Sequence, residues 1–370
     1  MDGKAKISVS QFFLLALFFI IGTSILLVPA GLAADAKQDA WIAAILGIIF
    51  TLLVVWLYTI LGKQFGDQNL VEFSENVLGK WVGGFISLNF IYFGIHNAAS
   101  LCFYVGNFIV TQIMTETPIQ FINATFAIVI IMGIRLGLET VARAAEILIP
   151  WFVGMYLVVV LSVLPDIELS HFMPVLENGI QPVLKAAIPL AATSGFVGIV
   201  FLMFYPSVIN NKQKASKAFL HAAWVGGSFI VIITALCIIV LGPDLAARQM
   251  FPTYALAKKI EIAQFLQRIE ALVAAMWVLS IYFKATLYLY SSITGLAQIL
   301  RLQSYRTLTI PMGLIMIVLS LVVYPNTVYM GYADKIVFVP YSMAIGLGIP
   351  FLLLLVAHFR KRKGALKKGS

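Results

Sequence analysis

The chain has 370 residues, of which 61% are hydrophobic and only 11% are charged, and its mean hydropathy is +0.98. These values exclude a water-soluble globular domain and are typical of a polytopic α-helical membrane protein. The net charge of +9 lies mostly in loops and in the C-terminal tail. We therefore expect no nucleic-acid binding, and the simplest interpretation of the basic tail is an anchor to membrane lipid headgroups.

Long apolar runs follow one another along the whole chain. A helix needs about 20 apolar residues to cross a hydrocarbon core of about 30 Å, and the short alternating segments of a transmembrane β-barrel are absent. We therefore expect one all-α transmembrane domain, residues 1–370, with ten transmembrane helices. The ten runs are 8–33, 40–61, 83–113, 121–137, 143–164, 182–208, 218–241, 267–297, 307–324 and 337–359.

The distribution of basic residues predicts the orientation. Most of the 25 Lys and Arg residues fall in segments that share one side of the membrane with the N-terminus. The positive-inside rule assigns that side to the cytoplasm, so both termini are predicted to be cytoplasmic. Loops 35–39, 166–181 and 243–266 are then outside, and 63–80 and 209–217 are inside. The first run has full length and no cleavage site follows it, so we expect it to be retained.

The first run is interrupted in its middle. The stretch "FFIIGTSILLVPAGL", residues 18–32, places Gly22, Thr23 and Ser24 among apolar residues, and Pro29 follows. Non-helical backbone at membrane depth is tolerated only where it lines a protein cavity. The sequence therefore predicts either a ligand-binding break in this helix or, as the alternative, a contact where small residues let helices pack closely.

The sixth run has the same features in "IPLAATSGFVGIV", residues 188–200. Five crossings separate the two interruptions, and an odd number of crossings inverts the second half of the chain relative to the first. Interrupted helices at matching places in two inverted halves indicate a transporter-type binding site. We expect a LeuT-type 5+5 inverted repeat with broken helices 1 and 6, repeat one at about 8–165 and repeat two at about 182–360.

These two breaks are the predicted ligand site. Freed backbone amides and the positive end of a half-helix favour an anionic group such as a carboxylate. The residues expected to line the site from the two breaks are Gly22, Thr23, Ser24, Ile25, Thr193, Ser194, Gly195 and Phe196.

The eighth run contains a lysine, Lys284, near its middle. An ionisable group at that depth costs about 2.5–3.5 kcal/mol or more, so we expect it to face the interior of the bundle. It is either an internal fixed cation, at a place where LeuT-type transporters hold a sodium ion, or a structural lysine bonded to backbone carbonyls. Thr286 and Tyr290, spaced i, i+4, are additional candidates for the ligand site.

The third run adds the polar residues His96, Asn97 and Ser100 as candidate ligand-site residues. His96 is either a ligand or pH-responsive group or a partner in an interhelical hydrogen bond. Walker, G-x-S-x-G and H-E-x-x-H motifs are absent. Cys102 and Cys237 lie singly in apolar runs and indicate neither a disulfide nor a metal site. We therefore expect no enzyme, no cofactor and no metal.

Three segments resemble the bacterial spore germination permease family. They are "MPVLENGIQPVLKAAIP" (173–189), "IEALVAAMWVLSIYFKATLYLY" (269–290), with its E-x6-W-x6-K spacing, and the looser pattern "G…LLVP…DAW" (22–41). The resemblance extends over essentially the whole chain. Members of this family are B subunits of nutrient germinant receptors and are related to amino acid–polyamine–organocation transporters.

The resemblance implies a spore inner membrane location and assembly with a larger A subunit and a lipoprotein C subunit. It also implies that the chain recognises a small germinant, often an amino acid. Two other functions fit the same residues: a proton-coupled amino acid transporter that uses Lys284 or His96, and a scaffold with a vestigial pocket. His96-Asn97 is a departure that bears on the identity of the germinant.

Overall fold

The computed structural model describes residues 6–209, 211–259 and 268–366, with the side chains of 206 and 361–366 left out. Lys4, Lys367 and Lys368, which contribute to the predicted orientation, lie outside the described residues, as does part of the predicted outer loop 243–266. Every regular element in the described part of the chain is helical.

The α-helices have the following bounds: α1 Val9–Ile21, α2 Ser24–Ala36, α3 Ala40–Gln64, α4 Leu70–Leu78, α5 Lys80–Gln112, α6 Ile119–Leu136, α7 Leu138–Ser162, α8 Ile180–Ser194, α9 Tyr205–Val208, α10 Lys212–Leu241, α11 Pro243–Arg248, α12 Pro252–Lys259, α13 Ile269–Ile299, α14 Arg306–Val322, α15 Thr327–Tyr332, α16 Val339–Met343 and α17 Ile349–Leu366. Short 3₁₀ segments are η1 Lys37–Asp39, η2 Leu164–Asp166, η3 Leu169–Phe172 and η4 Phe196–Met203, and η5 Ala333–Phe338 and η6 Ala344–Gly348 are π-helical.

Eight helical segments in the described residues are long and apolar enough to cross a membrane. The first of them, Val9–Gln64, contains two predicted runs, and α14, with 17 residues, falls just short of the length required. An all-helical membrane fold is therefore confirmed, while the count of ten crossings stays a prediction.

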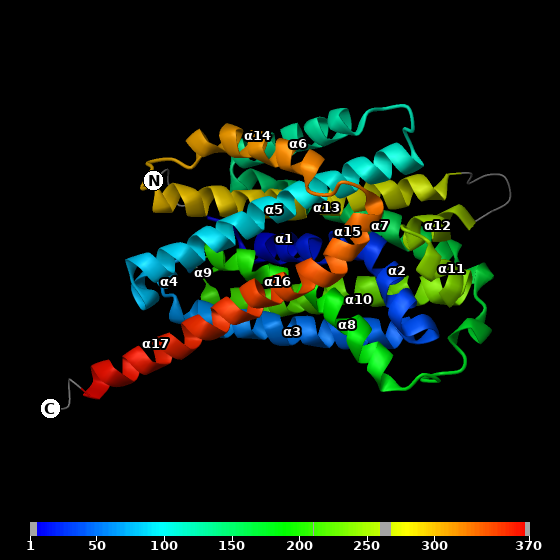
Figure 1. Ribbon diagram of the computed structural model, residues 1–370, viewed down its shortest axis with the longest axis horizontal. Coiled ribbons are helices and arrows are strands. Elements are labelled where there is room, and N and C mark those ends of the chain that lie inside the picture. The colour runs from blue at the N-terminus through cyan, green and yellow to red at the C-terminus, as the bar shows by residue number, and fades with distance from the viewer. Residues whose placement is uncertain (1–5, 210, 260–267, 367–370) are drawn as a thin grey trace.

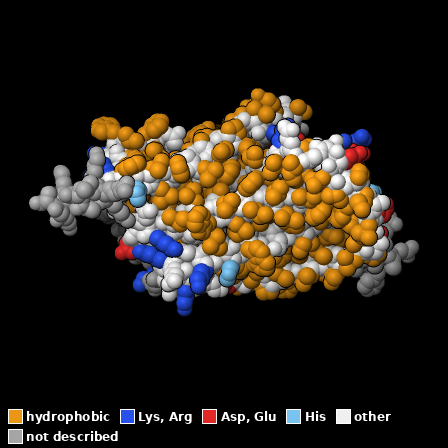
Figure 2. Space-filling model, turned by 90° about the horizontal axis from the view of Figure 1, so that it is seen from below, with side chains coloured by type: hydrophobic (Ala, Val, Ile, Leu, Met, Phe, Trp, Pro, Cys, Tyr) orange, Lys and Arg blue, Asp and Glu red, His pale blue; other side chains and the backbone are white. Residues whose placement is uncertain are grey.

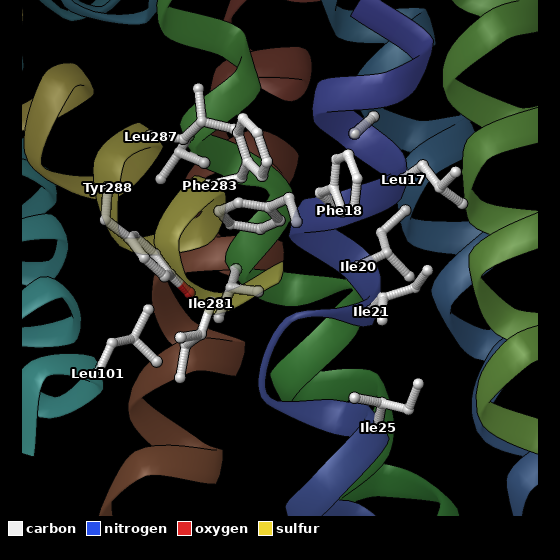
Figure 3. Close-up of a cluster of buried hydrophobic side chains, with 14 of the residues drawn as sticks. Leu17, Phe18, Ile20, Ile21, Ile25, Leu101, Ile281, Phe283, Leu287 and Tyr288 are labelled. Atoms are coloured by element: carbon white, nitrogen blue, oxygen red, sulfur yellow. The ribbon is translucent and has the colours of Figure 1, made fainter. Parts of the chain in front are cut away.

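Both interruptions predicted from the sequence are present. α1 ends at Ile21 and α2 begins at Ser24, with Gly22 and Thr23 between them in a turn. α8 ends at Ser194, and the chain then continues as the 3₁₀ segment η4 rather than as an α-helix. Figure 3 shows the first break, where the ribbon leaves the helix between Ile21 and Ile25.

The long helices run side by side along the long axis of the molecule (Figure 1). α1 and α13 pack at the centre, where Phe18 stacks on Phe283 with ring centroids 4.6 Å apart (Figure 3). Hydrophobic side chains cover the middle of the face in Figure 2, and most charged side chains lie towards its two ends. This distribution is the one expected of a protein that spans a membrane along its long axis.

Candidate functional site

Lys284 connects the two helix breaks. Its side chain extends from α13, is 1% exposed, and donates hydrogen bonds from Nζ to Thr23 Oγ1 at 2.8 Å and to the Thr193 carbonyl at 2.7 Å. An ammonium group has three donors, so one N–H remains after these two bonds. No carboxylate in the described part of the chain forms an ion pair with it. The side chain of Lys284 therefore links the two breaks and keeps one donor for a further partner.

Two serines join the breaks directly. Ser24 Oγ and Ser194 Oγ lie 2.8 Å apart and are buried, and Ser194 Oγ is also 3.4 Å from the Ile20 carbonyl. Each hydroxyl has one proton, so both contacts are satisfied when Ser24 donates to Ser194 and Ser194 donates to Ile20. A carbonyl left without its helical partner thus gains a side-chain donor.

Pro29 frees a second carbonyl, that of Ile25 in the first turn of α2. In a regular helix this oxygen accepts from the amide of residue 29, and proline has no amide hydrogen. The hydroxyl of Thr253 in α12 donates to the Ile25 carbonyl instead, at 2.6 Å, and Thr253 is fully buried. α12 therefore holds the outer half of the first broken helix in place.

A cavity of about 460 Å³ lies beside these contacts. The predicted site residues that line it are Thr23, Asn97, Ser100, Thr193 and Lys284. It extends to Asp35 and Arg248 at the end of the molecule where α2 and α11 end in Figure 1. A cavity of this size, mostly apolar with a few convergent polar groups, suits a small organic ligand.

Other predicted site residues lie beside the cavity and hold its walls together. Gly22 packs against Lys284, because a Cβ added there would lie 2.5 Å from the Lys284 Cδ. Gly195 faces α3, where a Cβ would lie 3.0 Å from the Cα of Thr51. The Phe196 carbonyl is 2.7 Å from the hydroxyl of Tyr58. Both breaks are thus closely packed beside the cavity.

Three predicted site residues lie farther away. His96 is half-buried and stacks on the exposed Tyr92, away from the cavity. Thr286 is 1% exposed and lines neither this cavity nor the second one described below. Tyr290 lines the second cavity. Their roles as ligand-site residues stay predictions.

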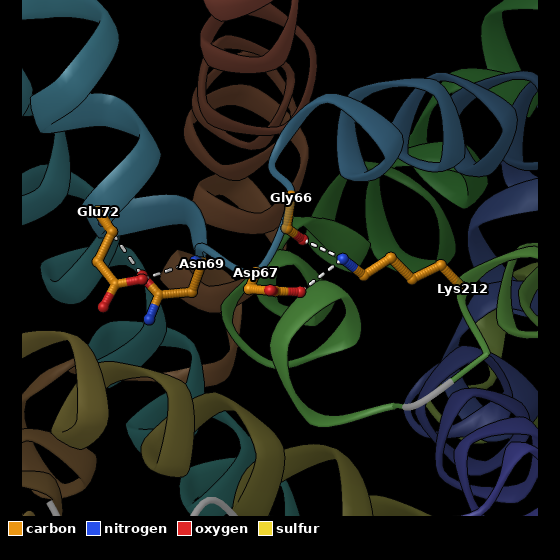
Figure 4. A network of polar contacts seen from close by, with 5 residues as sticks. All are labelled: Gly66, Asp67, Asn69, Glu72 and Lys212. Carbon is orange, nitrogen blue, oxygen red and sulfur yellow. Dashed lines mark hydrogen bonds and ion pairs between the residues drawn. The ribbon is translucent and has the colours of Figure 1, made fainter.

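The second cavity, of about 410 Å³, lies at the opposite end of the bundle. It is lined by Asp67, Glu139, Tyr290 and Thr294 among others, and the backbone amide of Lys6 donates to Glu139 at 2.8 Å. At the edge of this cavity, Lys212 of α10 binds the loop between α3 and α4. Its Nζ is 2.8 Å from Asp67 Oδ1 and 2.6 Å from the Gly66 carbonyl (Figure 4). Asn69 and Glu72 form the capping box that starts α4 beside this loop.

A cluster that the sequence analysis missed lines the first cavity: Tyr104, Tyr324 and Asp334. The Tyr104 hydroxyl is 2.7 Å from both carboxylate oxygens of Asp334, and the Tyr324 hydroxyl is 2.7 Å from one of them. The only signal in the sequence was a carboxylate in the segment "TVYMGYADKIVFVP", which is otherwise mostly apolar. The last predicted run began at residue 337, which assigned Asp334 to a loop.

No group of three or more His, Cys, Asp or Glu side chains in the part of the chain that the structure describes could hold a metal ion. Lys284 and Asp334, which line the first cavity, are instead bonded to hydroxyl groups and, in the case of Lys284, to a carbonyl. This arrangement suits non-covalent binding of a small polar molecule.

Comparison with known sequences identifies the family. The sequence model of the family described as "Spore germination protein" matches residues 6–328. The chain belongs to this family. It is 29% identical to "Spore germination protein KB" of Bacillus subtilis (strain 168), over 99% of this chain and 98% of that protein. It is 25% identical to "Spore germination protein XB" of Bacillus anthracis, over 94% and 96% of the two chains.

The fold of this family member is that of LeuT-type transporters. The structure superposes on MhsT in complex with L-phenylalanine with a TM-score of 0.69, 15% sequence identity, and coverage of 94% of this chain and 87% of that one. It superposes on the nucleobase-cation-symport-1 family transporter Mhp1 with a TM-score of 0.66, 13% identity, and coverage of 92% and 78%. At these identities the likeness concerns the fold, and the chain is a multi-pass membrane protein of that class.

Proposed function

We propose that this chain is the B subunit of a spore nutrient germinant receptor and recognises a small germinant in the cavity between the two helix breaks. Membership in the spore germination protein family supports the receptor role. The observation that supports the site is the contact of one ammonium, Lys284, with both breaks at the wall of a cavity of about 460 Å³.

The chemistry of the cavity favours a ligand with an anionic group, such as the carboxylate of an amino acid. Lys284 is buried in a low-dielectric environment, where an uncompensated charge attracts a counter-ion strongly. The free donor of its ammonium group and the hydroxyl of Thr23 lie on the same cavity wall. A ligand bound to Lys284 contacts a group that is bonded to both broken helices. Ligand binding can therefore change how these two helices pack.

The cellular setting belongs to the same proposal. The chain acts in the spore inner membrane with both termini in the cytoplasm, and it assembles with the receptor A subunit and the lipoprotein C subunit. The second cavity at the opposite end of the bundle favours one other function, a proton-coupled amino acid transporter. Uptake of labelled amino acid into vesicles that contain the chain separates transport from reception.

The test replaces Lys284 by methionine, which keeps a long side chain and removes the charge. Spores with Lys284→Met are expected to need at least about tenfold more germinant for a half-maximal response, because a buried charged hydrogen bond to the ligand is lost. Lys214→Met on the exposed start of α10 is the control. A wild-type dose response in Lys284→Met spores with normal subunit level would contradict the proposal.

A further inference from the structure

The first cavity is lined by a carboxylate that belongs to a membrane-spanning segment. Asp334 lies in η5, inside the apolar span Thr327–Arg360, and lines the cavity. The hydroxyls of Tyr104 and Tyr324 hold it at 2.7 Å. An ionisable side chain at such a place is costly and marks a functional site.

No cation in the described residues compensates this carboxylate. The adjacent Lys335 forms an ion pair with Asp35 at 2.6 Å instead, which connects η5 to α2 across the mouth. An ionised carboxylate has about four acceptor positions, and the two tyrosine hydroxyls supply one proton each. When ionised, Asp334 thus keeps acceptor positions free beside the cavity.

Lys284 is the complementary pole of the same cavity. Its ammonium group has one spare donor and no carboxylate partner among the residues described. The packing of α5 against α13 shows at which level of the bundle Lys284 and Tyr104 lie. Phe108 contacts Trp277 at 5.1 Å between ring centroids, and a Cβ on Gly94 would lie 3.1 Å from the Tyr288 carbonyl.

The two helices are therefore antiparallel in register, and Lys284 is opposite Leu101. Tyr104 lies three residues farther along α5, which is about 4.5 Å at the helical rise. Tyr104, which holds Asp334, thus lies about one helical turn from the level of Lys284 along the bundle.

We propose that Asp334, positioned by Tyr104 and Tyr324, is the subsite for the ammonium group of a zwitterionic ligand whose anionic group faces Lys284. This inference rests on the proposed function and narrows the ligand class to zwitterions such as free amino acids. A simple anion would leave Asp334 uncompensated, and an uncharged sugar would leave both poles uncompensated. A bipolar ligand pairs with both groups at once.

The experiment measures binding to the purified full chain in detergent by calorimetry. The probes are the twenty proteinogenic L-amino acids and, for the one that binds most tightly, the same acid without its α-amino group. The wild-type chain is expected to bind the amino acid at least about tenfold more tightly than the desamino acid, because the second compound leaves Asp334 unpaired. In Asp334→Asn this preference is expected to fall to about twofold or less.

Asp244→Asn is the matched control, because this exposed carboxylate at the start of α11 does not line the cavity. It is expected to keep the wild-type preference. Tyr104→Phe retains the carboxylate but removes one of the two hydroxyls that position it, so it is expected to reduce the preference for the amino acid by less than Asp334→Asn does. The wild-type ratio alone tests the proposal if Asp334→Asn does not fold.

Equal affinity of the wild-type chain for the two probes, or the same ratio in Asp334→Asn as in wild type, would overturn the subsite and leave the receptor role intact. Binding of an uncharged sugar in place of every amino acid would do the same. A chain that binds none of these nutrients, and whose deletion leaves spore germination unchanged, would overturn the proposed function itself.

Discussion

Removal of the Thr253 hydroxyl is expected to destabilise the chain, because the Ile25 carbonyl loses its hydrogen-bond donor. Thr253→Val keeps the shape of the side chain and loses the 2.6 Å hydrogen bond to Ile25. Pro29 cannot replace that donor, so a buried carbonyl is left without a partner, which costs about 1–3 kcal/mol. Thr253→Ser keeps the hydroxyl and is expected to lose less.

The double variant with Pro29→Ala is a stricter test of this carbonyl. Pro29→Ala supplies the missing amide, so the Ile25 carbonyl regains its helical partner and no longer needs Thr253. Thr253→Val is then expected to cost less than about 0.5 kcal/mol when Pro29→Ala is also present, a coupling of about 1 kcal/mol or more. Thermal and chemical unfolding of the four chains in detergent measure this cycle. An equal cost of Thr253→Val in both backgrounds would refute the assignment of this carbonyl.

Three further predictions concern the break, the orientation and the ions. Gly22→Ala is expected to displace Lys284 and cost about 1–3 kcal/mol in unfolding measurements, whereas Gly31→Ala, with open space around the new Cβ, is expected to cost less than about 0.5 kcal/mol; equal costs would contradict the packing at Gly22. A cysteine at exposed Ser170 should react with an impermeant thiol reagent on intact cells and one at exposed Lys214 should not, because loop 166–181 is predicted outside and loop 209–217 inside. The two native cysteines are buried and should not react. The reverse pattern would invert the orientation. Replacement of sodium by choline is expected to leave the dose response of spores unchanged, because the ammonium of Lys284 supplies the fixed charge; a sodium requirement would remove that role.

The helix breaks could be predicted from local sequence because their causes are local. Both breaks place a glycine beside a Thr-Ser pair with a proline nearby, and the free backbone groups of such a break are tolerated in a membrane only where they line a cavity. Lys284 could be predicted to face inward for the same reason. Its two partners could not, because the contacts with Thr23 and Thr193 depend on how three distant segments meet.

The rest of the candidate site depended on packing that local patterns do not contain. Tyr104 and Asp334 are 230 residues apart in sequence and meet only where η5 crosses α5. His96 and Asn97 are neighbours in sequence, yet the helix turns by about 100° per residue, so one stacks on the outer Tyr92 and the other lines the cavity. Polar residues on a predicted transmembrane helix therefore needed the angular position of that helix before they could be assigned to a site.

The most direct test of the ligand site is the structure of the chain, in its receptor assembly, with a saturating germinant. We expect density for the germinant in the cavity of about 460 Å³, with an anionic group within hydrogen-bond distance of Lys284 Nζ and beside Thr23. Density in the second cavity or at a subunit interface, with the space beside Lys284 empty, would contradict it.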